Sequence, residues 1–371
     1  MSSEFTFGFG DDDIAIDEYE DEQVPAGKTS NLKETCNEAG AALHEACRVD
    51  MSEMLSSLPS QISYSTLYLS DPIDFQIPVP IPRREVFDIR AQLMAEDSLK
   101  DDLQEEMISG LETGDITPLV YEGGFKTWEC AQMLALYAGS QYLYSDRMKH
   151  DWEFIELGAG TAIPSLFLLK MSLDDPLPTV EQEKRRISFV FADYNIAVLK
   201  LVTLPNIILT WYFSKHPKAE PASEIDINHS LLESFQNDLS ARGISLSFIS
   251  GAWSPRLVDL IASVSNVNET SSLKTFILAS ETIYSPTSLV SFAETLSSLL
   301  LQRHERNSGA FPDQVKPEAL VAAKELYFGV GGGVDEFLVA LESVAGSKLL
   351  ATRGMEAMSP GVRLTVLNIR P

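Results

Sequence analysis

Residues 154–162 read Phe-Ile-Glu-Leu-Gly-Ala-Gly-Thr-Ala, and this stretch indicates the fold class of the 371-residue chain. An apolar run of strand length leads into an acidic residue, a Gly-x-Gly turn and then an apolar segment with helical spacing. Gly158 permits a tight turn, and Gly160 lets the backbone approach a ligand closely. Because open α/β sheets bind ligands at the carboxyl ends of their strands, a ligand site is predicted directly after Leu157.

Strand-length apolar runs alternate with helical patterns from about residue 120 to the end of the chain. We expect strands at 154–157, 187–192, 246–250, 275–280, 319–323, 348–351 and 362–369, and helices at 162–171, 196–203, 256–264, 288–303 and 334–344. This alternation predicts a parallel sheet with helices on both faces, and the last two strands predict a terminal hairpin. The predicted fold class is α/β, with a seven-stranded Rossmann-like domain over residues 120–371 and an N-terminal extension.

The first 119 residues differ in composition from the rest. Residues 1–60 include the acidic run Asp11–Glu22, and we expect them to be disordered, as a solvated tail or as an acidic and aromatic docking arm. Residues 61–119 are expected to form an extension that packs on the core. Four prolines between residues 72 and 82 indicate an extended stretch, and helical spacing predicts a helix over 85–107.

The formal net charge of −26 at pH 7 restricts the partners of the chain. It repels nucleic-acid backbones and acidic lipid surfaces, so we expect neither direct nucleic-acid binding nor membrane contact. The charge either attracts a basic partner or only keeps the protein soluble. No apolar run reaches the roughly 18 residues that span a bilayer, and the first residues lack the pattern of a secretory signal. Three cysteines cannot form a disulfide framework, which fits a reducing compartment, so we expect the protein in the cytoplasm and nucleus. Neither the cysteines nor the five histidines have metal-ligand spacing, so we expect no metal site. We also expect a monomer.

The glycine turn could serve two kinds of cofactor. Dinucleotide enzymes use G-x-G-x-x-G and place a pyrophosphate on the helix N-terminus, but Ile163 stands at the third glycine position. Glu156 would also repel a pyrophosphate, whereas it suits a cationic amino group. S-adenosylmethionine carries an ammonium and a sulfonium and no phosphate, so it is the expected cofactor. A glycine turn without a ligand is the alternative.

The end of the second predicted strand favours an adenosine-containing cofactor. Asp193 follows Ala192 there, and a carboxylate in this position can accept both ribose hydroxyls. It stands 37 residues after Glu156, whereas the dinucleotide spacing is about 20. The alternative interpretation of Asp193 is a helix N-cap.

Several separated segments then agree with one known family. They are Tyr121–Cys130, Glu156–Pro164, Asp193–Asn195 with Val202–Asn206, Ser250–Ser254, Ser280–Tyr284 and Ala322–Gly333. Together they resemble the protein-histidine N-methyltransferases that modify a large-subunit ribosomal protein. The resemblance covers about residues 120–371 and implies a class I S-adenosylmethionine-dependent methyltransferase domain. One departure is Ala162, where many relatives have glycine.

The resemblance implies a role for each matched segment. Residues against the cofactor ahead of the first strand would be Thr127, Trp128, Glu129, Cys130 and Ala131. The methionine end would be held by Glu156, Gly158 and Gly160, and the ribose and adenine by Asp193, Tyr194, Asn195, Gly251, Ala252 and Trp253. Nearest the transferred methyl group would be Ser280 and Glu281. The implied partner is a basic large-subunit ribosomal protein, methylated on the distal (tele) ring nitrogen of a histidine, with an effect on ribosome biogenesis or translation.

Methyl transfer to histidine makes modest chemical demands. With a pKa of about 6.5, the imidazole is largely neutral at pH 7, so no strong base is needed. An acceptor on one ring nitrogen fixes the tautomer and exposes the other nitrogen. Glu281 is the candidate acceptor, with Tyr284 or Tyr327 shaping the pocket; a purely structural carboxylate is the alternative.

Other functions fit parts of the sequence. A lysine methyltransferase of the same fold would use the acidic-x-x-aromatic spacing of Glu281 and Tyr284. An acidic, non-catalytic chaperone for a basic ribosomal protein would use the net charge, and a nicotinamide dehydrogenase would need the complete glycine pattern. The glycine-rich segment 329–333 either admits a substrate backbone or is a flexible loop.

Overall fold

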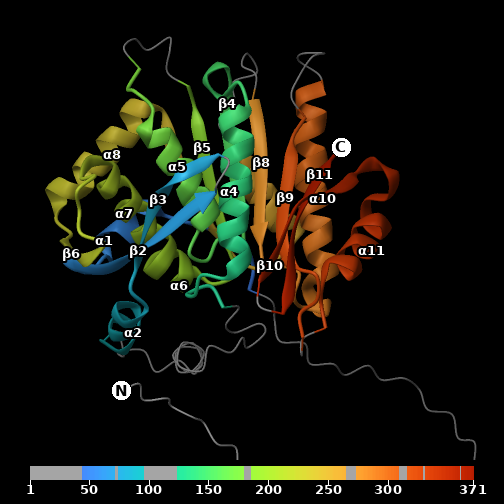
Figure 1. Cartoon of the computed structure of the whole chain (residues 1–371), viewed down its shortest axis with the longest axis horizontal. Helices are drawn as coiled ribbons and strands as arrows, with labels where there is room; N and C mark the ends of the chain where they lie inside the picture. Colours follow the sequence, from blue (N-terminus) through green and yellow to red (C-terminus); the bar gives the residue numbers. More distant parts are fainter. Residues whose placement is uncertain are drawn as a thin grey trace, which may run out of the picture. The chain divides into compact units, whose positions relative to one another are not determined.

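The centre of the computed structural model is an eight-stranded sheet (Figure 1). The structure describes residues 44–71, 74–95, 123–178, 185–264, 273–308, 316–328, 331–359 and 361–371. The chain divides into residues 1–41 and 42–371, and every described residue belongs to the second unit. In spatial order the strands are β1 (Cys47–Val49), β7 (Ile244–Ser250), β5 (Ile187–Asp193), β4 (Asp151–Leu157), β8 (Leu273–Ser280), β9 (Glu318–Lys324), β11 (Val362–Arg370) and β10 (Leu350–Ser359).

The predicted α/β fold class is confirmed by this topology. Strands β7, β5, β4, β8 and β9 run parallel, and β11 and β10 form the antiparallel hairpin at the end of the chain. The chain order reverses at β4, because β5 lies on one side of it and β8 on the other. The loop after β4 therefore lies at the topological switch point, where open α/β sheets bind their ligands.

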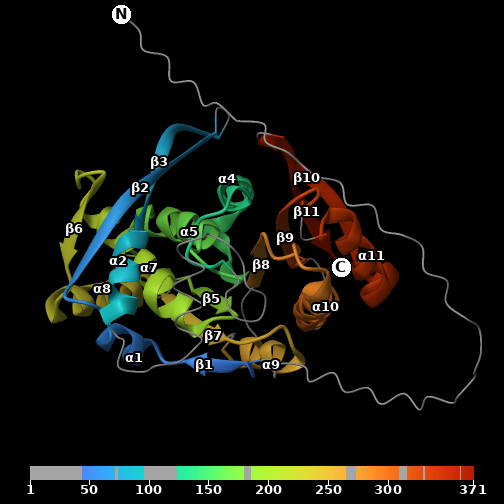
Figure 2. The same cartoon turned by 90° about the horizontal axis from the view of Figure 1, so that it is seen from below.

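Helices cover both faces of the sheet (Figure 2). One face carries α4 (Glu129–Tyr144), α5 (Ile163–Asp174) and α7 (Leu204–Lys215), and the other carries α9 (Pro255–Val264), α10 (Pro286–Ser308) and α11 (Val334–Ala345). Successive side chains of β4 enter opposite cores: Phe154 packs with the first set of helices and Ile155 with the second. A strand buried on both faces is mostly apolar, which is why these strands read as apolar runs; in β4 the exceptions are Glu153 and Glu156.

A second, three-stranded sheet packs outside the first set of helices. It contains β3 (Phe75–Arg84), β2 (Gln61–Asp71) and β6 (Ala222–Asp226), with β2 in the middle. Its residues Ile62 and Ile81 are fully buried in the same core as α5 and α7. Three of the prolines occupy alternate positions of β3, and an edge strand tolerates proline because its outward donors need no partner.

Several elements differ from the expectations. Strand β1 and helix α1 (Met51–Ser56) lie within residues 1–60, so that part of the segment is folded rather than disordered. Helix α2 (Val86–Ala95) begins where a helix was predicted, and residues 96–107 of that prediction lie outside the described residues. The helix α8 (His229–Arg242) was not predicted.

The helix predicted at 196–203 is the beginning of a longer helical run. It passes through α6 (Ile196–Val198) and a π-helical turn (Leu199–Thr203) into α7. The run Ile196–Lys215 is long and apolar enough to cross a membrane by length and composition, but 78% of its most apolar window is buried inside the fold. Its composition is therefore explained by its place in the core.

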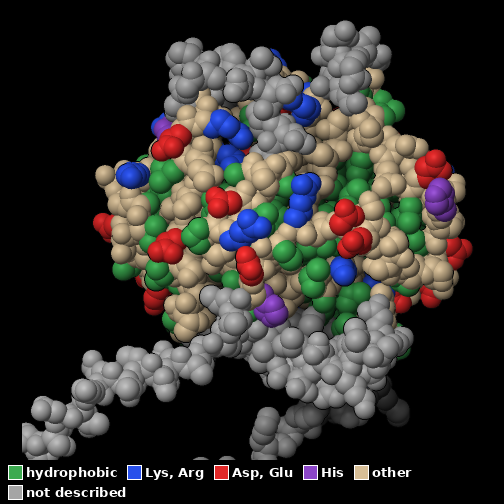
Figure 3. Space-filling view, turned by 180° about the vertical axis from the view of Figure 1, so that it is seen from behind, with side chains coloured by type: hydrophobic (Ala, Val, Ile, Leu, Met, Phe, Trp, Pro, Cys, Tyr) green, Lys and Arg blue, Asp and Glu red, His purple; other side chains and the backbone are tan. Residues whose placement is uncertain are grey.

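On the face seen in Figure 3, acidic and basic side chains are interspersed among apolar ones rather than gathered in one acidic patch.

A buried ion pair ties β4 to α10. The guanidinium of Arg303 donates to both carboxylate oxygens of Glu153, at 2.8 and 3.0 Å, and Thr275 Oγ1 donates to the same carboxylate at 3.0 Å. Both charged side chains are almost wholly buried, at 3% and 1% exposure. Removal of one partner would leave the other charge in a site without water.

We predict that Arg303→Met lowers the free energy of unfolding by about 3–5 kcal/mol, because Glu153 then stays buried without its partner. Chemical denaturation measures the change. The double variant Glu153→Leu/Arg303→Met is the control and should regain most of the loss. A single variant as stable as the wild type would contradict the prediction.

Candidate active site

The glycine turn after β4 adopts a backbone that only small residues accept. Gly158 and Gly160 have φ of 69° and 51°, and Ala162 has φ of 59°. A Cβ atom on Gly158 would lie 2.7 Å from Thr282 Cγ2, so the first glycine is also required for space. Ala162 occupies the left-handed region that favours glycine, which is a physical reason for glycine in many relatives. The turn nevertheless forms, and α5 begins at Ile163.

Glu156 lies at the end of β4 with 2% exposure. Its Oε2 accepts a hydrogen bond from the Ser165 amide at 3.1 Å. Burial, and secondarily the charge of Asp193, raises the pKa of Glu156 to about 8. Among the described residues, no lysine or arginine forms an ion pair with this carboxyl group, so the site can accept a cation from a ligand.

Asp193 connects the end of β5 to the glycine turn. Its Oδ2 accepts the Gly160 amide at 2.9 Å, and its Oδ1 accepts the Asn195 amide at 3.0 Å. The N-cap of α6 is Asn195, so Asp193 is not the cap that one interpretation required. A carboxylate has about four lone-pair positions, which leaves acceptor capacity for ligand hydroxyls.

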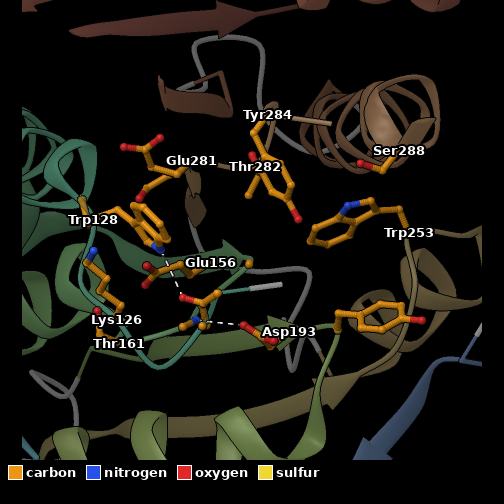
Figure 4. A pocket seen from close by; sticks show the side chains of 18 of the residues that line it. Lys126, Trp128, Glu156, Thr161, Asp193, Trp253, Glu281, Thr282, Tyr284 and Ser288 are labelled. Atoms are coloured by element: carbon orange, nitrogen blue, oxygen red, sulfur yellow. Dashed lines mark hydrogen bonds between the residues drawn. The ribbon is translucent and has the colours of Figure 1, made fainter. Parts of the chain in front are cut away.

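These groups surround a cavity of about 320 Å³ at the carboxyl ends of the strands (Figure 4). Trp128 and Trp253 stand on opposite sides of it, and Tyr284 lies between them. Twelve of the predicted site residues line it: Trp128, Ala131, Glu156, Gly158, Gly160, Asp193, Tyr194, Ala252, Trp253, Ser280, Glu281 and Tyr284.

The other six predicted residues support the lining. Thr127 Oγ1 donates to Thr161 Oγ1 at 3.0 Å, and Glu129 pairs with Lys324. The Cys130 amide donates to Glu281 Oε1 at 3.4 Å, and burial raises the pKa of its thiol. The Asn195 amide donates to the Asp193 carboxylate, and the Gly251 amide donates to the Asp193 carbonyl. The Tyr327 ring packs edge-on against Tyr284, with centroids 6.3 Å apart.

Glu281 follows β8 in a strained backbone conformation. Its φ of 57° lies in the left-handed region, and its side chain is buried. Such conformations persist where the surrounding structure determines them, often at functional sites. Its backbone amide donates to the Ala322 carbonyl at 2.9 Å, and its carboxylate accepts from the Cys130 amide, so one bond holds the backbone and the other holds the side chain.

Some lining residues were not among the predicted site residues. They are Gly123, Gly124, Lys126, Ala159, Thr161, Ile163, Pro164, Thr282, Thr287, Ser288 and Ser291. Gly123, Gly124 and Lys126 belong to a segment on which the family resemblance rests, so that segment carried a usable signal. The residues from α10 come from a distant part of the sequence, and no local pattern marks them.

Gly332 and Gly333 have a packing role that neither interpretation anticipated. A Cβ atom on Gly332 would lie 2.3 Å from the Tyr284 carbonyl oxygen, and one on Gly333 would lie 2.5 Å from the Glu325 carbonyl oxygen. Glycine is therefore needed because two backbone segments touch. Residues 329 and 330 lie outside the described residues.

The cavity fits a cofactor that carries positive charge and no phosphate. Two buried carboxyl groups, Glu156 and Asp193, face the space where a Rossmann enzyme would bind a pyrophosphate. Together with the strand order, this site defines a class I S-adenosylmethionine-dependent methyltransferase.

Comparison with known proteins identifies the family. The chain matches no protein-family model. It is 34% identical over 298 residues to the histidine protein methyltransferase 1 of Saccharomyces cerevisiae, covering 75% of this chain and 73% of the relative. The Schizosaccharomyces pombe protein of the same name is also 34% identical over 298 residues, with 79% and 76% covered, and a Bos taurus homologue is 27% identical over 257 residues, with 69% and 57% covered. The chain belongs to the histidine protein methyltransferase 1 family and is an S-adenosylmethionine-dependent protein-histidine methyltransferase.

We predict that cofactor binding at pH 7 releases a proton from Glu156. The free carboxyl group has a pKa of about 8 and is mostly protonated at pH 7, whereas a bound ammonium favours its ionised form. Affinity for S-adenosylmethionine should rise between pH 6 and 8, by up to about tenfold per pH unit. Calorimetry in buffers of different ionisation enthalpy measures the proton.

Glu156→Gln should bind the cofactor more weakly and abolish this pH dependence. The matched control is Glu342→Gln, the same change on the exposed face of α11, which should behave as the wild type. An unchanged proton release in Glu156→Gln would show that another group titrates.

Proposed function

We propose that this enzyme methylates the tele nitrogen of a histidine in a basic large-subunit ribosomal protein, and thereby affects ribosome biogenesis or translation. Histidine is proposed as the methyl acceptor because Glu281, the residue after β8, lines the cavity. A buried carboxylate is a suitable acceptor for the N–H of a neutral imidazole ring.

The lining residues divide the cavity into a cofactor part and an acceptor part. Glu156 would receive the ammonium of the cofactor, and Asp193, which holds the glycine turn, would receive ribose hydroxyls. The adenine would be held by Tyr194, Ala252 and Trp253, which line the cavity. The acceptor part lies beside Trp128, Glu281 and Tyr284, on the other side of Glu156 from Asp193 (Figure 4).

The reaction then needs positioning more than acid–base chemistry. The cofactor supplies a methyl group on a sulfonium, which a neutral nitrogen attacks in line. Glu281 accepts the N–H of the acceptor ring, so the other nitrogen presents its lone pair. As the ring becomes an imidazolium, the same carboxylate stabilises its positive charge.

The ribosomal substrate is proposed from the resemblance and from the charge. A net charge of −26 attracts a strongly basic protein over a distance, and ribosomal proteins are basic because they bind RNA. Such a substrate would be met in the cytoplasm, where it is synthesised, or in the nucleus, where it is assembled. We further propose that the enzyme acts as a monomer.

We expect label from methyl-labelled S-adenosylmethionine to appear as methylhistidine in one basic protein of the large subunit. The acceptors are ribosomal proteins purified from cells without the enzyme, and amino-acid analysis identifies the product. Gly158→Arg should abolish labelling, because a side chain there meets Thr282.

The matched control is Gly361→Arg. Gly361 also has a positive φ, of 78°, but a Cβ atom there meets nothing within 4 Å, so labelling should persist. Label on lysine would favour the lysine methyltransferase suggested by the Glu281 and Tyr284 spacing. Tight binding of a basic protein without any label would favour the chaperone.

A further inference from the structure

A lysine lies behind Glu281, outside the residues that line the cavity. Lys324 is the last residue of β9, next to the end of β8. Its Nζ lies 3.1 Å from Glu129 Oε2 and 3.9 Å from Glu281 Oε1. One ammonium is therefore paired with two carboxylates, that of Glu129 at the start of α4 and that of Glu281 directly after β8.

Aromatic rings complete the surroundings of this ammonium. The Nζ of Lys324 lies 5.6 Å from the centroid of the Trp128 ring and 6.0 Å from that of Tyr327, within the range of cation–π attraction. Partial burial alone would lower the pKa of Lys324. The nearby carboxylates of Glu281 and Glu129 raise it by more, so the pKa lies above its ordinary value. The side chain is a cation held beside Glu281 and Trp128, two residues that line the cavity.

We infer that Lys324 makes the acceptor site select a neutral imidazole and reject a protonated lysine. The inference rests on the proposed function, and it assigns to Lys324 the choice between histidine and lysine as the methyl acceptor. An arriving ammonium would be repelled by the ammonium of Lys324 beside Glu281 and by the sulfonium, whereas an arriving neutral imidazole carries no charge to repel.

Charge conservation along the reaction explains why histidine is accepted. The imidazole nitrogen forms a bond to the methyl carbon, and the carbon–sulfur bond breaks with its electron pair going to sulfur. The positive charge thus moves from sulfur to the ring, and the ring N–H proton is later lost to water. A lysine arrives as an ammonium and must first lose a proton, so it meets the repulsion of Lys324 that a neutral imidazole does not meet.

The test compares two acceptors in wild-type and variant enzymes. The probes are the recombinant ribosomal protein that becomes labelled in the experiment above and the same protein with its labelled histidine replaced by lysine. We expect the wild type to methylate only the histidine form. Lys324→Met should lower kcat/KM for that form several-fold and raise kcat/KM for the lysine form at least tenfold. Lys324→Arg should retain the selectivity of the wild type.

Two controls separate specificity from folding. Calorimetry should give Lys324→Met and Lys324→Gln the cofactor affinity of the wild type, because Lys324 does not line the cofactor part. Glu129→Gln removes the more exposed carboxylate of the cluster, keeps Lys324 beside Glu281, and should keep the lysine form excluded.

Lys324→Met or Lys324→Gln that binds the cofactor normally and keeps the wild-type preference would overturn the inference. So would a wild type that methylates the lysine form as fast as the histidine form. Failure of the proposed function looks different, because the wild type would then label no histidine in any ribosomal protein.

Discussion

The hydrogen bond from the Gly160 amide to Asp193 Oδ2 is the contact on which the rest of the site depends. It joins the ends of β4 and β5, the two strands that carry the cofactor site. The same turn is held from the other side, where Thr203 Oγ1 donates to the Gly160 carbonyl at 2.8 Å and Asn206 Nδ2 donates to the Thr161 carbonyl at 3.1 Å. A backbone fixed in this way can keep left-handed residues, and it orients the carboxyl groups before any ligand arrives.

The two ends of the cavity manage negative charge in different ways. Glu156 is buried without an ion pair among the described residues, and its raised pKa keeps it neutral until a ligand supplies a cation. Glu281 is also buried, but it is ion-paired with Lys324 and accepts a hydrogen bond from the Cys130 amide. The first arrangement favours a charged ligand, and the second favours a neutral ring that donates a hydrogen bond.

Local patterns were sufficient to predict six of the strands, the glycine turn and the strand-end carboxylates, because each depends on a few adjacent residues. The strand predicted at 348–351 shares only residues 350 and 351 with β10 (Leu350–Ser359), which continues through exposed, polar positions. Strand β1 was missed because three residues carry too little pattern, and its pairing with β7 is a tertiary contact. The role of Gly332 was missed for the same reason, since only the fold brings it against Tyr284. Lys324 could not be assigned either, because its partners stand on α4 and after β8.

In the proposed mechanism a neutral imidazole, held by Glu281, attacks without a strong base. The decisive experiment is the pH dependence of single-turnover methylation, with S-adenosylmethionine saturating at every pH. The rate should rise through the ordinary imidazole pKa of about 6.5 and be level above about pH 8. A rate that continues to rise toward the lysine pKa of about 10.4 would contradict it.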